Sequence, residues 1–193
     1  AGFVSYEAAP AFDSALETKS TDSFPLIWFG LYPKPKRISL KGCQSKYASR
    51  DLKWTASVNR ALFGEAIEQI KTLIASGDTY QVNYTFRLSS PFSEDPWPLF
   101  LELVQSQQSE YGAFIDTEAY SICSASPELF FQLDDRKLAC RPMKGTADRG
   151  RTSAEDNAQA QWLHHSEKNR AENVMIVDML RNDMGRVART GSV

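Results

Sequence analysis

The sequence predicts an α+β fold with a large share of antiparallel sheet, and three observations lead to this class. An amphipathic helix pattern runs over residues 58–74. A succession of short strand-like segments occupies residues 112–141, and a long helical pattern begins at Ser153. The sequence shows no internal repeat and no low-complexity tract, so we expect one folded domain.

The first half of the chain combines short strands with one clear helix. Residues 25–32 (PLIWFGLY) are aromatic and β-prone, which predicts a buried strand, and Pro33 and Pro35 break it. The helix has Ser57 as its expected N-cap and Gly77 as its expected end. The expected elements are a strand at 2–6, a loop at 10–24, the strand at 25–32, a polar stretch to about residue 53, the helix at 58–76 and a strand at 79–88.

The second half begins and ends with helical patterns, with strands between them. Residues 96–105 predict a helix, and strands are expected at 112–117, 120–125, 128–133 and 137–141. From Ser153 the pattern is helical, in two pieces, as far as Gly185. Ser166 suits the N-cap of the second piece, and Gly185 suits the position that follows its end.

The composition is that of an ordinary globular domain. The 193 residues are 42% hydrophobic and 24% charged, with a formal net charge of -2, which argues against nucleic-acid binding by bulk electrostatics. No apolar run is long enough to span a bilayer, and no signal-peptide pattern opens the chain. Cys43, Cys123 and Cys140 lie far apart and form no CxxC pair. We therefore expect a cytoplasmic protein with no nucleic-acid or membrane partner.

A hairpin of the strands at 128–133 and 136–141 would bring an acid close to an amine. A two-residue turn at 134–135 would place Glu128 opposite Arg141. Lys144 lies shortly beyond, after Pro142 has ended the ladder. Both groups would then lie at the open end of the hairpin, although a three-residue turn would shift this register.

Cationic side chains gather just after this hairpin, with glycines and a hydroxyl between them. They are Arg141, Lys144, Arg149 and Arg151, and the intervening residues include Gly145, Thr146 and Gly150. Glycines allow a ligand to approach the backbone closely, and guanidinium groups suit carboxylates. The loop is therefore a candidate receptor for a small anion. The alternative is a solvated basic loop, because charge clusters usually lie at the surface.

Lys144 and Glu128 are also candidates for covalent and acid–base chemistry. A lysine attacks only as the neutral amine, and a free lysine has a pKa of about 10.4. Neighbouring cations and desolvation favour the neutral amine, and Arg141 and Arg149 could supply the cations. Glu128 could protonate a leaving hydroxyl.

Glu172 is a candidate metal ligand. It lies among apolar residues of the last helix, with Asn169 one turn earlier on the same face. A carboxylate and an amide oxygen suit Mg²⁺, which takes few protein ligands and keeps several waters. The alternative is a surface ion pair with Lys168 or Arg170. The adjacent histidines at 164–165 point in different directions on a helix and lack the spacing of paired metal ligands.

Four segments together resemble the chorismate-binding enzymes, a family that includes anthranilate, aminodeoxychorismate, isochorismate and salicylate synthases. They are 77–83 (GDTYQVN), 126–130 (SPELF), 141–146 (RPMKGT) and 170–183 (RAENVMIVDMLRND), and they occur in the family's order. Residues 2–7 (GFVSYE) and 28–30 (WFG) are similar to the aminodeoxychorismate branch. The resemblance implies a fold like that of anthranilate synthase component I, with large antiparallel sheets and helices.

Two positions distinguish branches within the family. Anthranilate synthases usually carry alanine where this chain has Lys144, and the isochorismate and salicylate synthases also lack this lysine. The latter two place a water-activating lysine where this chain has Gln81. Both positions therefore favour the aminodeoxychorismate synthases.

This resemblance implies a specific reaction. Mg²⁺, with Glu172 as one ligand, would hold the ring carboxylate of chorismate, and Gly145 and Thr146 would lie against the substrate. Lys144 would attack ring carbon 2 while the 4-hydroxyl leaves with help from Glu128. Ammonia from a glutamine amidotransferase subunit or domain would then displace the lysine and give 4-amino-4-deoxychorismate, a precursor of 4-aminobenzoate and folate.

Two departures from the family pattern keep other functions open. Family members usually have an acidic residue at the position of Asn169, and they continue beyond the end of this chain with a further segment that carries more magnesium ligands. Residues 1–193 are therefore expected to be the N-terminal and central portion of a chorismate-binding catalytic domain. The alternatives are an anthranilate synthase component I that carries the lysine, and a non-catalytic fragment or ligand-binding module.

Overall fold

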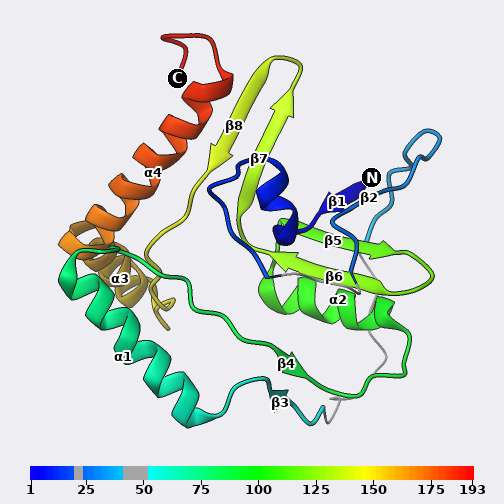
Figure 1. Ribbon diagram of the computed structural model, residues 1–193, viewed down its shortest axis with the longest axis horizontal. Helices are drawn as coiled ribbons and strands as arrows, with labels where there is room; N and C mark the ends of the chain where they lie inside the picture. The colour runs from blue at the N-terminus through cyan, green and yellow to red at the C-terminus, as the bar shows by residue number, and fades with distance from the viewer. Residues whose placement is uncertain (20–23, 41–51) are drawn as a thin grey trace. The chain divides into compact units, whose positions relative to one another are not determined.

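The computed structural model describes residues 1–19, 24–40 and 52–193 (Figure 1). The chain divides into two compact units, which are described separately. The first contains the described residues of Ala1–Cys43 and Leu99–Val193, and the second those of Gln44–Pro98. Parts of the predicted loop at 10–24 and of the polar stretch before residue 53, together with Cys43, lie outside the described residues.

The first unit begins with a short antiparallel ribbon. Strand β1 (Gly2–Val4) pairs with β2 (Ile27–Phe29), and the 3₁₀ helix η1 (Tyr6–Ala11) follows β1. Aromatic stacking supports the ribbon, since the Phe3 ring lies 5.1 Å from that of Phe24 and 6.1 Å from that of Trp28. The strand predicted at 25–32 exists, but the prediction of its burial is wrong. Ile27 is 55% exposed and Phe29 63%, because β-propensity does not reveal what packs against a strand.

A helix packed on a hairpin forms the principal core of the first unit. Strands β5 (Tyr111–Asp116) and β6 (Ser121–Ser126) pair antiparallel, and α2 (Pro96–Gln107) lies along them from Leu99 onward, where it belongs to this unit (Figure 1). The Phe100 and Phe114 rings are 5.5 Å apart, and Phe100 and Leu101 are each only 5% exposed. A side chain at Gly112 would come within 2.8 Å of Val104, so glycine lets the helix approach the strand.

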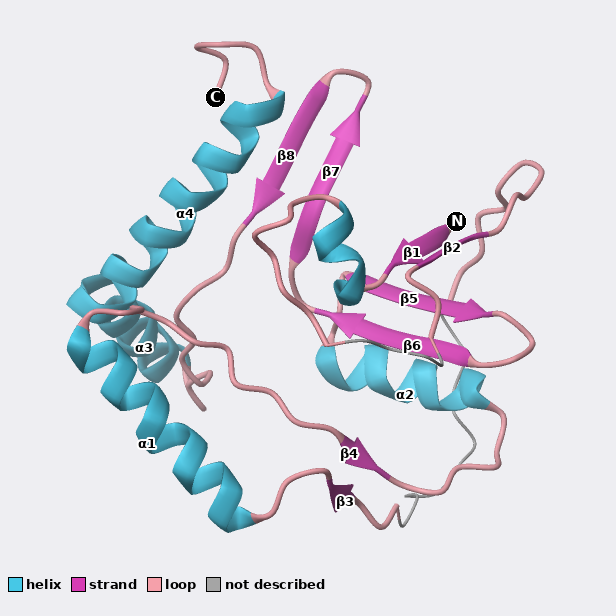
Figure 2. Cartoon of the chain, viewed as in Figure 1, coloured by secondary structure: helices cyan, strands magenta, loops and turns pink. Residues whose placement is uncertain are grey.

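The second hairpin leads directly to the lysine loop, residues 142–152. Strands β7 (Leu129–Asp134) and β8 (Lys137–Arg141) pair antiparallel (Figure 2). The predicted register is wrong, because the turn lies at 135–136 rather than 134–135, and Asp135 takes the positive φ of 52°. A register shift follows between Leu129 and Gln132, so that Leu129, not Glu128, lies opposite Arg141.

Two consecutive helices follow the lysine loop, as the sequence predicts. They are α3 (Ser153–His165) and α4 (Glu167–Val187). Each has a hydroxyl N-cap, since Thr152 accepts from the Glu155 N–H and Ser166 from the Asn169 N–H. The expected end at Gly185 is wrong, because α4 continues to Val187.

The second unit contains the amphipathic helix predicted from the sequence. Helix α1 (Arg60–Ser76) begins after Asn59 rather than Ser57, and Gly77 ends it in the left-handed conformation at φ 82°. The short strands β3 (Thr55–Ala56) and β4 (Leu88–Ser89) pair antiparallel. Only Leu88 of the predicted strand at 79–88 is in a strand, so that prediction is largely wrong.

The α+β class is confirmed by these elements. Within the described chain, the antiparallel sheet takes the form of four two-stranded sheets. Across residues 1–19, 24–40 and 52–193, none of the helices combines the length and the apolar character needed to cross a bilayer. Cys123 and Cys140 are thiols that form no disulfide, and burial raises the pKa of the Cys123 thiol.

Candidate active site

Glu128 contacts the backbone beside the candidate nucleophile. It lies just before β7, and its carboxylate oxygen Oε1 accepts a 2.8 Å hydrogen bond from the backbone N–H of Met143. Ser126 fixes the approach to β7, because its hydroxyl donates to the Glu128 carbonyl at 2.9 Å. The Glu128 carboxylate therefore contacts the backbone immediately before Lys144, through a hydrogen bond beyond the ladder rather than through the predicted pairing.

Lys144 is half-buried in a loop that packs against α4. The next residue, Gly145, has a φ of 73°, a conformation that favours glycine. A side chain at this position would come within 3.0 Å of Oδ1 of Asn169. The lysine loop thus approaches the first turn of α4 at a point where only a glycine fits without displacement, whereas the Thr146 side chain is exposed.

Asn169 and Glu172 lie one turn apart on α4. The Asn169 side-chain amide donates to the Ser166 hydroxyl at 3.0 Å. The half-buried Glu172 carboxylate lies 3.9 Å from Nζ of Lys168, which is the surface ion pair that the sequence left open. The loop that carries Lys144 therefore contacts the same helix that carries Glu172.

A complete metal site is absent from the described part of the chain. None of its residues forms a group of three or more histidine, cysteine or acidic side chains suited to a metal ion. Glu172 alone could give a hard cation one carboxylate ligand, and Mg²⁺ accepts such a site only when waters or other groups complete its octahedron. Glu172 therefore fits the role of one protein ligand in the coordination shell of Mg²⁺.

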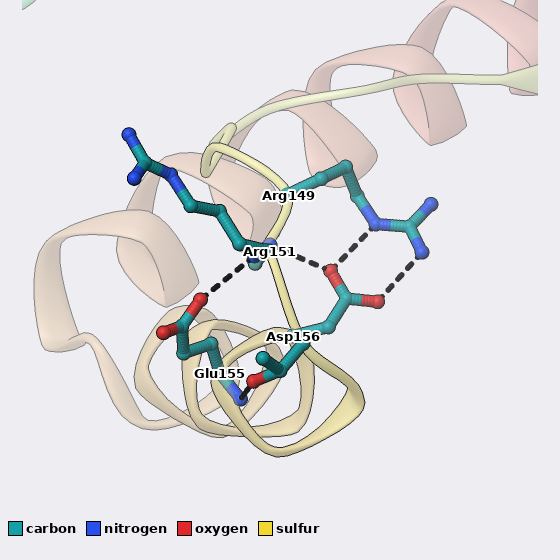
Figure 3. A network of polar contacts seen from close by, with 6 residues as sticks. Arg149, Arg151, Glu155 and Asp156 are labelled. Carbon is teal, nitrogen blue, oxygen red and sulfur yellow. Dashed lines mark hydrogen bonds and ion pairs between the residues drawn. The ribbon is translucent and has the colours of Figure 1, made fainter.

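Arg149 is not available as a free cation, which corrects the expectation that it supports the lysine or binds a substrate. Its guanidinium makes two 2.6 Å hydrogen bonds to the Asp156 carboxylate on α3 (Figure 3). The Gly150 N–H donates to the same carboxylate at 3.0 Å. The bond to Arg149, followed by that to Gly150, lowers the pKa of Asp156, and Asp156 raises the pKa of Arg149.

The other cations of the loop have separate environments. Arg141 donates from Nη1 to the Tyr111 hydroxyl at 3.4 Å. The Arg151 side chain points away from the acidic pair in Figure 3, while its backbone N–H donates to Glu155 at 2.8 Å. The structure therefore does not gather all four cations into one anion receptor.

The acidic residues that hold this loop are not among the candidates that the sequence predicts. Asp156 and Glu155 lie in the first turn of α3. The pattern Thr152-x-x-Glu155 is the start signal of a helix and could have placed that turn next to the loop. No local sequence pattern predicts the ion pair between Arg149 and Asp156, because it depends on the path of the backbone between these two residues.

Two further sequence candidates make contacts within their own elements. Gln81 belongs to the second unit, where its side-chain amide donates to Asn83 at 3.4 Å. The rings of His164 and His165 are perpendicular at 5.1 Å, and the His165 ring contacts the Gln161 carbonyl at 2.8 Å. These contacts are local to a loop and a helix, respectively.

Comparison with known proteins identifies the family. The profile of chorismate binding enzymes matches residues 34–193. Aminodeoxychorismate synthase component 1 of Escherichia coli is 44% identical over 140 residues, which cover 72% of this chain and 31% of that protein. The Bacillus subtilis protein of the same name is 46% identical over 131 residues, covering 68% of this chain and 28% of the relative.

Anthranilate synthases are also related. Anthranilate synthase component 1 of Thermus thermophilus is 36% identical over 154 residues, covering 80% of this chain and 33% of that protein. The crystal structure of anthranilate synthase component I from Streptococcus pneumoniae is similar with a TM-score of 0.62 and 30% identity, over 70% of this chain and 29% of that one. The chain thus spans about a third of the length of these relatives, and it belongs to the chorismate-binding enzymes.

Proposed function

We propose that this chain carries the nucleophile and the acid of an aminodeoxychorismate synthase component 1. The contact of Glu128 with the backbone N–H next to Lys144 is the observation that carries the proposal. It is supported by identities of 44% and 46% to two aminodeoxychorismate synthases, against 36% to the anthranilate synthase of T. thermophilus. The activity is proposed for the protein at its full natural length, as a cytoplasmic transferase of 4-aminobenzoate and folate synthesis.

Lys144 would form the covalent bond. Its neutral amine attacks ring carbon 2 of chorismate, the ring double bond shifts, and the bond from carbon 4 to the hydroxyl breaks. Glu128 in its protonated form gives the departing hydroxyl a proton, so that water leaves. The lysine nitrogen then loses its extra proton, which the regenerated carboxylate of Glu128 would accept.

Ammonia completes the exchange. It would add at carbon 4, the double bond would shift back, and the bond between carbon 2 and the lysine would break as the amine regains a proton. The product is 4-amino-4-deoxychorismate. We assign the supply of ammonia to a glutamine amidotransferase subunit or domain, in keeping with the words "component 1" in the names of the relatives.

Substrate placement would fall to the glycine and threonine after the lysine, and to α4. Gly145 and Thr146 would lie against the substrate, and the positive φ of Gly145 would set the path of the backbone there. Glu172 would hold Mg²⁺ as one ligand, and the ion would orient the ring carboxylate and neutralise its charge. Lys168 would have to release Glu172, and a 3.9 Å pair with an exposed lysine is weak enough to be replaced.

A covalent adduct is the most direct test. The full-length protein is incubated with chorismate and Mg²⁺ without ammonia and analysed by peptide mass spectrometry. We expect an adduct at Lys144 that is absent in Lys144→Ala and retained in Lys137→Ala, a control at the exposed turn end of β8. An unmodified Lys144, in a protein that turns over when ammonia is present, would contradict covalent catalysis.

Anthranilate synthesis is the second candidate, favoured by the similarity to anthranilate synthase component I in sequence and structure. Product analysis with chorismate, ammonia and Mg²⁺ separates the two. We expect 4-amino-4-deoxychorismate, and 2-aminobenzoate would reassign the protein to the anthranilate branch. If calorimetry detects no chorismate binding by the folded protein, both give way to a non-catalytic role.

A further inference from the structure

The lysine loop is held at points on both sides of Lys144. Before the lysine, the Met143 N–H donates to Glu128 at 2.8 Å. Just after it, the backbone of Gly145 lies against the Asn169 side chain. Farther along, Arg149 and Gly150 are both bound by Asp156. The lysine therefore lies on a segment whose two ends are attached to different elements of the first unit.

The attachment at Asp156 is the most extensive of these. Its two oxygens receive parallel 2.6 Å bonds from the Arg149 guanidinium, which is the geometry of a strong, directional ion pair. The same carboxylate accepts from the Gly150 N–H at 3.0 Å. One side chain thus fixes both a side chain and the backbone of the loop, and its negative charge suits the N-terminal end of α3.

The backbone around Gly150 shows how tightly the loop lies on α3. A side chain at Gly150 would come within 2.5 Å of the Glu155 carbonyl carbon and closer still to the Asp156 nitrogen. The next N–H, of Arg151, donates to Glu155 at 2.8 Å. Thr152 then caps the helix, so the end of the loop and the start of α3 form one continuous hydrogen-bonded unit.

We infer that Asp156 is a positioning residue for Lys144, acting through Arg149 and Gly150. The inference rests on the proposed function, because it assigns Asp156 a part in placing the nucleophile. Without this attachment, the segment between Gly145 and Arg151 would be held less tightly, and the lysine amine would sample more positions. A nucleophile displaced by about 1 Å can lose about a hundredfold in rate, so the effect should appear in the chemical step.

The test uses the full-length protein and the substitution Asp156→Asn. Asparagine has nearly the same size and can still accept from Gly150, but it loses the charge that holds Arg149. We expect kcat, and the rate of adduct formation at Lys144, to fall about ten- to a hundredfold, while the KM for chorismate stays within about threefold. Backbone amides of residues 143–151 should exchange hydrogen faster than in the wild type.

The matched control is Glu68→Gln. Glu68 forms an exposed 2.7 Å ion pair with Lys71 on α1, and its substitution removes the same charge from the second unit. We expect no change in kcat or in exchange at residues 143–151. If Asp156→Asn does not fold, Arg149→Lys replaces it, because lysine keeps the charge but cannot form the two parallel bonds.

The outcomes separate this inference from the proposed function. The wild type could show neither amination nor an adduct, while its amides at 143–151 exchange slowly and Asp156→Asn makes them exchange faster. That result would overturn the proposed function but support the attachment of the loop by Asp156. Full kcat and unchanged exchange in either loop variant would overturn the inference. A parallel loss in kcat and gain in KM, without faster exchange at 143–151, would also overturn it, because that pattern indicates direct substrate binding.

Discussion

The two hairpins of the first unit are stabilised in different ways. At β5–β6, helix α2 covers the sheet and buries Phe100 and Leu101. At β7–β8 and in α3 and α4, no residue is buried, and Phe130 is 81% and Val174 61% exposed. Hydrogen bonds and an ion pair hold the lysine loop there. The region proposed for chemistry is therefore the one with less apolar packing of its own.

This difference has a consequence for the complete domain. Exposed polar pairs each contribute little to stability, whereas large exposed apolar surfaces usually mark contacts with other polypeptide. The chain spans 31% of the length of its E. coli relative. We expect the apolar residues of β7 and α4 to be covered in a domain of the relatives' full size. Four substitutions test how differently the apolar core at α2 and the polar lysine loop contribute to stability.

Phe100→Ala should have the largest effect. Removing a buried aromatic side chain from the α2 core should lower the free energy of unfolding by about 3–5 kcal/mol. Urea denaturation of the full-length protein measures it, with Phe130→Ala in the other hairpin as the comparison. We expect a comparable loss at Phe130, because β7 should be covered in the full-length protein. A position that stays at the surface would change stability by only about 0.5 kcal/mol or less. A cost at Phe130 equal to that at Phe100 would show that further polypeptide covers β7.

Gly145→Ala examines the polar region directly. The positive φ of 73° and the nearby Asn169 side chain make a methyl group unfavourable, so we expect a loss of about 1–2 kcal/mol in unfolding free energy. The control is Gly64→Ala in α1, where nothing lies within 4 Å of the added methyl group. There alanine should stabilise the helix by about 0.5–1 kcal/mol. Equal effects of the two substitutions would contradict the described loop conformation.

Thr152→Ala should have a smaller effect at the junction of loop and helix. The Thr152 hydroxyl accepts from the Glu155 N–H at 3.2 Å, and the loss of an N-cap costs about 1 kcal/mol. Thermal unfolding measures the change, and Thr152→Ser should restore most of the stability because it keeps the hydroxyl. A serine variant as unstable as the alanine variant would argue against a capping role.

The pH dependence of the Arg149–Asp156 pair should be the smallest effect. The pKa of Asp156 is lowered in the folded protein, so its stabilising contribution is present above the unfolded pKa of about 3.9. It is lost as the pH falls through the folded value. The difference in unfolding free energy between the wild type and Asp156→Asn should be constant above about pH 5 and shrink below about pH 4. A difference that shrinks toward neutral pH would contradict the pairing.

Most of the secondary structure follows from local sequence patterns. The spacing of Leu62, Ile70 and Ile74 predicts α1, and Ser166 predicts the start of α4. The register of β7–β8 could not be predicted, because residues 134–136 offer adjacent turn positions of similar propensity. The register shift near Leu129 depends on tertiary context.

The site was predicted in part. Its conspicuous residues, Lys144 and Glu128, belong to continuous motifs, and the Glu128 carboxylate contacts the backbone of the residue before Lys144. The pairing of Arg149 with Asp156 could not be predicted, because it joins residues that lie outside any ladder or helical repeat. The exposure of Phe29 likewise depends on what packs against β2 rather than on its own propensity.

The four two-stranded sheets have a consequence for the folding of such a chain during its synthesis. Every strand of the described sheets has a neighbour on one side only, which leaves a row of backbone donors and acceptors open on the other. Such rows pair readily with any extended segment. During synthesis, correct sheet extension and faulty pairing between neighbouring copies would compete for the same edges. The outcome of that competition would then influence the yield of native protein.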